Sequence, residues 1–101
     1  MAPPPSRAAV PSRAAVRERI LALAQRARGS ICPSQVARSF AAAREHWMPL
    51  MPLVRSEAAE VIGGGARAGA GGRLVCTQRG VDVGLPTAAR GPVRLRWLPA
   101  Q

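Results

Sequence analysis

The sequence predicts an α+β domain in which three helices precede a two-stranded antiparallel ribbon. Apolar residues recur at helical spacing between residues 12 and 62, and apolar and polar residues alternate in two segments further along the chain. Glycine or proline separates these segments, as is typical of connections. With 101 residues, the chain has room for one domain with a small core. We expect that domain to span residues 12–98.

The first helix is predicted to begin next to Ser12, because serine often accepts a hydrogen bond from the free amides of a first helical turn. Its expected core face consists of apolar residues three or four positions apart, namely Val16, Ile20, Leu23, Ala24 and Ala27. Gly29 is expected to end this helix, and Ile31 to begin a short extended segment.

A second, shorter helix is predicted over about residues 33–40. Cys32 precedes it as N-cap, and Pro33 fills the first helical position, where a missing amide hydrogen leaves no helical bond unmade. Gln35 stands where a capping box has Glu or Gln. A thiol at such a position is either a capping group or a redox-sensitive thiolate, and both interpretations stay open for Cys32.

The stretch EHWMPLMPLVR, residues 45–55, fits a PxxP ligand, an irregular loop or the start of a helix. Apolar residues continue from it at helical spacing, which favours the helix: Trp47, Leu50, Met51, Val54, Ala58 and Val61 or Ile62. Pro52 lacks an amide hydrogen, so it must lie in the first turn of that third helix. We expect the helix to end near Ile62 and the glycine-rich residues 63–72 to form a flexible loop.

Two later segments alternate with the period of a strand. The residues expected to face the core are Leu74, Cys76, Gln78, Val93, Leu95 and Trp97. The segment 80–92 between them contains glycine and proline, so we predict an antiparallel hairpin with a long tip.

Three helices, an extended segment after the first, and a final ribbon follow the order of a winged helix-turn-helix domain. This α+β fold is the class that we predict. A plain three-helix bundle with an unstructured tail is the alternative, but it would leave the clean alternation over residues 93–97 without a purpose.

Four motifs in this order carry a resemblance to a known family: ICPSQVAR, W..LMP.VR, GRLVCTQRG and RGPVRLRW. The sequence resembles a bacterial family of small winged-helix domains of unknown function over about residues 17–97. The resemblance implies the fold and no particular biochemical role. The chain departs from the family pattern at Gln35, where Glu is usual, and in the longer glycine-rich segment 63–72.

All fifteen basic residues are arginine, and five acids oppose them, which gives a net charge of +10. Such an excess favours a polyanionic partner. A composition rich in Ala, Arg, Gly and Pro is also what GC-rich codons produce in any protein. The positions of the arginines in the fold therefore matter more than their number.

We expect DNA as the partner, bound through the third helix and an arginine-bearing wing. On the helix, Arg55 is the expected base reader, with an intramolecular pair to a helix carboxylate as its alternative role. The expected contacts of the ribbon and its tip are Arg79, Arg90, Arg94 and Arg96. The alternative for these four is an ordinary solvated strand face, and the alternative function is a protein-interaction module on the same scaffold.

The sequence offers little for catalysis or metal binding. Cys32, Cys76 and the single His46 are too few for a disulfide framework or a zinc site. The glycine-rich run lacks the Lys-Ser/Thr ending of a phosphate-binding loop. We therefore expect a protein that is not an enzyme and that has no cofactor and no metal.

The remaining expectations concern location and the N-terminal segment. No stretch approaches the roughly 18 apolar residues of a membrane span, so no membrane partner is expected. The two cysteines fit a reducing cytoplasm. Residues 1–11 are rich in proline and alanine and contain Arg7 but no acid, which predicts a disordered basic tail.

Overall fold

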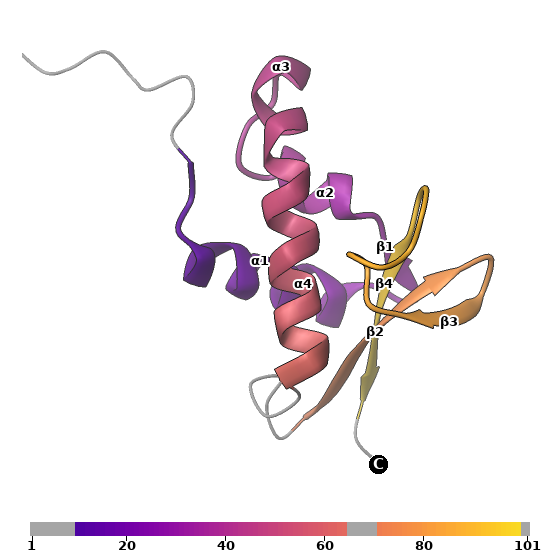
Figure 1. Ribbon diagram of the computed structural model, residues 1–101. Helices are drawn as coiled ribbons and strands as arrows, with labels where there is room; N and C mark the ends of the chain where they lie inside the picture. Colours follow the sequence, from indigo (N-terminus) through magenta and orange to yellow (C-terminus); the bar gives the residue numbers. More distant parts are fainter. Residues whose placement is uncertain (1–9, 65–70, 100–101) are drawn as a thin grey trace, which may run out of the picture.

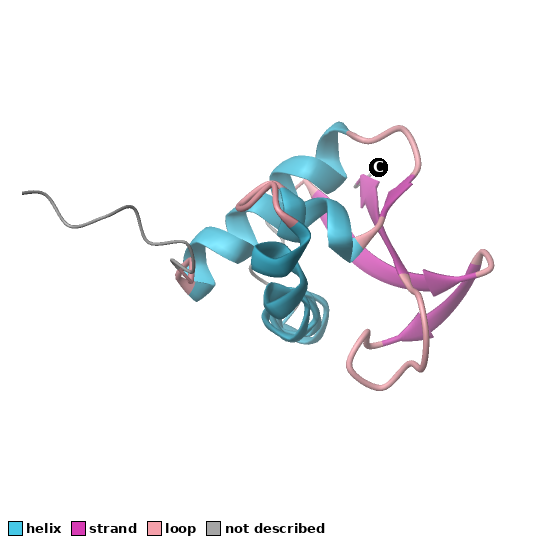
Figure 2. Ribbon diagram, turned by 90° about the horizontal axis from the view of Figure 1, so that it is seen from above, coloured by secondary structure: helices cyan, strands magenta, loops and turns pink. Residues whose placement is uncertain are grey.

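The computed structural model describes residues 10–64 and 71–99, and it confirms the α+β class. Figures 1 and 2 show the helices gathered on one side and the strands on the other. The elements are α1 (Arg13–Arg26), β1 (Ser30–Ile31), α2 (Pro33–Arg38), α3 (Arg44–Trp47), the 3-10 turn η1 (Met48–Leu50), α4 (Met51–Gly64), β2 (Gly72–Gln78), β3 (Val81–Gly84) and β4 (Arg94–Pro99). Nearly all of the predicted tail 1–11 lies outside the described residues.

The two N-terminal caps form as predicted. The Ser12 side chain accepts a hydrogen bond from the Ala15 amide at 3.1 Å. At the start of α2, the Gln35 side-chain oxygen accepts a hydrogen bond of 2.8 Å from the Cys32 amide, and Pro33 occupies the first turn. Local capping chemistry therefore determines where α1 and α2 begin.

The prolines of residues 45–55 open a helix, as predicted. Met48–Leu50 form a 3-10 turn, and α4 begins at Met51, so that Pro52 lies in its first turn. Trp47, which shares the helical spacing of the apolar residues, does not belong to α4 but to the separate one-turn helix α3. Pro49 cannot donate a hydrogen bond to the turn before it, which interrupts the helical ladder between α3 and α4.

The sheet has four antiparallel strands in the order β1-β4-β2-β3, and the expected two-stranded ribbon is therefore wrong in its strand number. The extended segment after α1 joins the sheet as β1, where Ser30 pairs with Arg96. The additional strand β3 lies inside the predicted long tip. It follows β2 through a two-residue turn, in which Arg79 has φ 52° and Gly80 has φ 81°. Positive φ at both positions is the geometry of a type I′ hairpin turn.

The core lies between α1, α4 and the inner face of the sheet. Fully buried side chains meet there from all three, among them Ile20, Val54 and Leu95. Cys76 belongs to this core as expected, and burial raises the pKa of its thiol while the charge of Arg55 offsets part of the rise. Trp47 is half-buried and packs against the margin of the core.

One charged side chain is buried among these apolar residues. Glu57 of α4 is 3% exposed, and its carboxylate lies 3.0 Å from Nε of Arg17 on α1. Arg13 approaches the other carboxylate oxygen at 3.8 Å. Glu57 therefore forms an ionic link between the two long helices.

The glycine-rich residues 63–72 contain two different kinds of position in their described part. Gly63 and Gly64 end α4 and have open space where a Cβ would lie. Gly72 begins β2 with φ +150°, and a Cβ there would lie 2.2 Å from the Leu98 carbonyl oxygen. The predicted loop is thus shorter at both ends, and residues 65–70 lie outside the described part of the chain.

Candidate functional site

The outward face of β4 carries arginines, as the alternation predicted. Arg94 and Arg96 are exposed, whereas the residues between and before them, Leu95 and Val93, are buried. Directly opposed residues of antiparallel strands point to the same side of a sheet. Arg73 of β2 opposes Leu98, which lies two residues after Arg96 on the same face. We call the side of the sheet that carries Arg73, Arg94 and Arg96 the outer sheet face.

Arg73 was not among the predicted site residues. The signal for it was present, because the alternation of Val75 and Thr77 continues back by two residues to Arg73. The glycine-rich residues before it hid the start of the strand.

Arg94 is engaged inside the protein. Its Nε and one terminal nitrogen donate to the Ser30 side chain and carbonyl at 2.7 and 2.9 Å. The other terminal nitrogen lies 2.9 Å from the Cys32 sulfur at the start of α2. Arg94 therefore connects β4 to β1 and to the second helix, and its guanidinium is less available to a ligand than that of Arg96.

Arg55 is half-buried and does not lie on the solvent face of α4, so its expected placement is wrong. Its guanidinium donates to the carbonyl oxygens of Pro86, Ala89 and Gly91 at 2.8, 3.1 and 3.3 Å. The partners are loop carbonyls and not the helix carboxylate considered as an alternative. Arg55 thus fastens the loop 85–93 to α4.

The solvent-facing side of α4 contains no arginine. The side chains that α4 exposes are those of Pro52, Ser56 and Glu60, spaced four residues apart on one stripe. Pro52 has no donor, Ser56 is short, and Glu60 would repel a phosphate. This stripe therefore offers few groups that could contact bases in the major groove of DNA.

Arg79 and Arg90 lie at two tips beside the sheet. Arg79 is in the hairpin turn between β2 and β3, Arg90 is in the loop 85–93, and both side chains are exposed. Gln78 connects the two tips, because its side-chain nitrogen donates to the Arg90 carbonyl and, at 3.1 Å, to that of Pro92. The sequence placed Gln78 on the core face and did not reveal this role.

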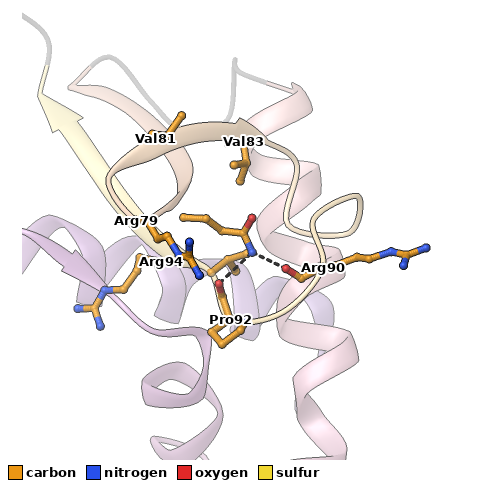
Figure 3. A pocket seen from close by; sticks show the side chains of 8 residues that line it. Arg79, Val81, Val83, Arg90, Pro92 and Arg94 are labelled. Carbon is orange, nitrogen blue, oxygen red and sulfur yellow. Dashed lines mark hydrogen bonds between the residues drawn. The ribbon is translucent and has the colours of Figure 1, made fainter.

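A cleft of about 670 Å³ lies between these tips. Figure 3 shows Val81 and Val83 on its β3 side and Arg90 and Pro92 on its loop side. The complete lining consists of Gln78, Arg79, Val81, Val83, Arg90, Pro92, Val93 and Arg94. This lining contains no carboxylate, and Figure 3 shows the side chains of Arg90 and Arg94 directed away from the cleft.

Within residues 10–64 and 71–99, no group of three His, Cys, Asp or Glu side chains is placed to hold a metal ion. In the same part of the chain, no helix is long and apolar enough to cross a membrane. Both cysteines there are free thiols.

The fold and the site define a small α+β domain whose sheet side is rich in arginine. The model of the family described as "Protein of unknown function (DUF3253)" matches residues 13–98, from the first residue of α1 almost to the end of β4. The chain belongs to this family. This confirms the resemblance to a small domain family, while the winged-helix and bacterial parts of the resemblance stay predictions. The comparison with curated proteins gave no match.

Proposed function

We propose that this domain is a winged helix-turn-helix module that binds nucleic acid, with DNA as the expected form, and that it carries out no catalytic step. The order of its elements supports the fold assignment. A short strand after the first helix pairs with the last strand, and the helices α2, α3 and α4 lie between that short strand and β2. The loop 85–93 and the β2–β3 turn would then form the wing.

The observation that carries the proposal is the charge of the sheet segment. Residues 71–99 contain one acid, Asp82, whose carboxylate accepts a hydrogen bond from the Gly84 amide. The same segment contains five exposed arginines on the outer sheet face and the two tips: Arg73, Arg79, Arg90, Arg94 and Arg96. Exposed guanidinium groups attract phosphates and release the counterions bound to them.

The expected mode of binding is contact with the phosphate backbone. The exposed stripe of α4 has no arginine, and Arg55 is occupied by loop carbonyls, so neither supports readout of bases. Arg55 contributes indirectly, by holding the loop that bears Arg90. The proposal therefore predicts binding that depends strongly on salt and weakly on sequence.

Removing single arginines should change the salt dependence of binding. We expect Arg90→Ala and Arg96→Ala each to reduce the slope of log K against log salt by about 0.9, which corresponds to one lost phosphate contact. The slope is measured by fluorescence anisotropy with a labelled mixed-sequence duplex at four salt concentrations. Arg94 is avoided because its loss would also disturb β1.

Arg44→Ala is the matched control for these variants. Arg44 is an exposed arginine of α3, which Figure 1 places at the end of the molecule away from the sheet. Its loss should leave the slope unchanged. Equal slopes for all three variants would mean that the sheet side is not the interface.

A second test uses the backbone of Arg79. Its φ of 52° is a conformation that asparagine and glycine adopt more easily than arginine does. Arg79→Asn should therefore raise the free energy of unfolding by about 0.5–1 kcal/mol while weakening duplex binding. Urea unfolding and the anisotropy titration measure the two effects separately. A variant that is more stable and binds equally well would remove Arg79 from the interface.

The runner-up function is a protein-interaction module, and a specific observation favours it. Val81 is 65% exposed on the edge strand β3, next to the cleft with its aliphatic lining. An exposed apolar side chain is more useful to a protein partner than to a phosphate backbone.

A further inference from the structure

A stripe of exposed side chains runs from α3 through η1 and along α4. Its members lie four residues apart, and every one of them is exposed: Arg44, Met48, Pro52, Ser56 and Glu60. Figure 1 shows α3 at the end of α4, on the helical side of the molecule. Helical residues four apart are neighbours on the surface and form a ridge, which is the unit by which helices pack together. We call these five residues the exposed stripe.

The order of chemical groups makes the exposed stripe complementary to itself. A cation stands at one end and an anion at the other, and Pro52 lies midway between them in the sequence. If a second copy lies antiparallel across Pro52, Arg44 of each copy meets Glu60 of the other. Met48 then meets Ser56, a small side chain that leaves room for it. A twofold axis of this kind is the commonest symmetry of homodimers.

The exposed stripe is also the surface on which two cationic chains can approach with the least repulsion. The chain has a net charge of +10, and residues 71–99 carry five exposed arginines against one acid. Along the stripe, one arginine is balanced by one glutamate. The single arginine of α4, Arg55, donates to loop carbonyls instead. Glu45 is exposed beside Arg44 but lies about 100° around the helix axis, so it is not part of the ridge.

We propose that the exposed stripe pairs two copies of this chain in a weak antiparallel dimer, with Pro52 at the twofold axis and Arg44 bound to Glu60 of the second copy at both ends. Small and apolar groups then lie in the centre and charged pairs at the rim, as in most protein interfaces. One pair of helices is expected to bury less than the roughly 1,200–2,000 Å² of a stable complex, so the dimer forms only in concentrated protein.

The proposal does not rest on the proposed nucleic-acid binding. Figures 1 and 2 show the strands on the side of the molecule away from the helices, so the outer sheet face stays accessible in the pair. The duplex titrations use dilute protein, in which the chain is expected to be monomeric. Arg44→Ala therefore still serves as their control.

Sedimentation equilibrium of the full chain measures the association. Over about a hundredfold range of protein concentration, ending near about 1 mM, we expect the average mass to rise from 10.6 kDa toward twice that value. Glu60→Arg brings like charges together at both ends of the pair and should weaken association at least about tenfold. Wild-type protein that stays monomeric throughout would refute the dimer and leave the exposed stripe to a different protein partner.

A charge-swapped variant tests the antiparallel register. Arg44→Glu alone should weaken association as Glu60→Arg does, whereas the two changes together restore opposite charges and should recover most of the affinity. Glu18→Arg, at an exposed position of α1, adds the same charge as Glu60→Arg and should leave association unchanged. If the swapped variant associates as weakly as the single variants, the proposed pairing is wrong.

Pro52→Glu tests the centre of the pair. The twofold axis would bring the two introduced carboxylates together, so association should be lost. Glutamate in the first turn of a helix is favoured by the helix dipole, so each copy should keep its fold, which a thermal melt verifies. A folded variant that still dimerises would place the contact elsewhere and overturn the proposal.

Discussion

Arg17→Met is expected to lower the free energy of unfolding by about 3 kcal/mol. The substitution leaves the Glu57 carboxylate, 3% exposed, with only the more distant Arg13 at 3.8 Å. A buried charge that loses its close partner destabilises a protein by several kcal/mol, and the partial exposure of Arg17 places this pair at the lower end of that range. Urea unfolding followed by circular dichroism measures the change.

The double variant Arg17→Met with Glu57→Met is the informative companion. It removes both charges and leaves apolar side chains of similar length between α1 and α4, so most of the lost stability should return. Arg26→Met, at an exposed position near the end of α1, should change stability by no more than about 0.5 kcal/mol. If the double variant is as unstable as the single one, the cost comes from packing and not from an unpaired charge.

Arg55→Met is expected to lower the free energy of unfolding by about 2–3 kcal/mol and to loosen the loop 85–93. It removes hydrogen bonds from a charged donor to the carbonyls of Pro86, Ala89 and Gly91. Each bond of this type contributes about 1.5–3 kcal/mol, and water replaces part of the loss at this half-buried position. Unfolding experiments give the global change, and amide hydrogen exchange at Ala88 and Ala89 reports on the loop.

Arg55→Lys is the matched control, since it keeps the charge and most of the length. A lysine ammonium cannot span three carbonyls as the planar guanidinium does, so little of the loop protection should return. Full recovery in the lysine variant would mean that charge alone holds the loop. Unchanged exchange in the methionine variant would show that other contacts fix it.

The helix boundaries were largely predictable from the sequence, because their determinants are local. Ser12 and Gln35 cap helices through atoms three residues away, and Pro52 restricts the start of α4 through its own backbone. The periodicity of apolar residues likewise predicted the core positions Ile20, Val54 and Leu95, which are all fully buried.

The strand β3 was not predicted because its segment is short and its determining turn is unusual. Val81–Gly84 offers four residues between glycine-bearing stretches. The turn before it requires positive φ at Arg79, an arginine, where a sequence signal would be asparagine or aspartate. Because Gly80 was interpreted as the start of a long hairpin tip, no feature of the sequence indicated that Val81–Gly84 would pair with β2.

The candidate site was predictable in its residues and not in their partners. Alternation along β4 correctly placed Arg94 and Arg96 on the exposed side. The roles of Arg55 and Gln78 depend on a loop that is distant in sequence, 31–36 residues away for Arg55. Contacts of this length follow from the closed fold, and no local pattern encodes them.

The contact between Gly72 and the Leu98 carbonyl has a consequence for how sequences of this kind can diverge. Any side chain at position 72 would collide with the neighbouring strand, whereas positions 63 and 64 face open space and would accept alanine. The number and identity of residues after α4 can therefore drift between related chains, provided that glycine remains at the point where β2 meets β4. Gly72 lies in the same strand register that pairs Cys76 with Leu95. Selection should therefore preserve glycine at this position, even while the residues before it vary freely.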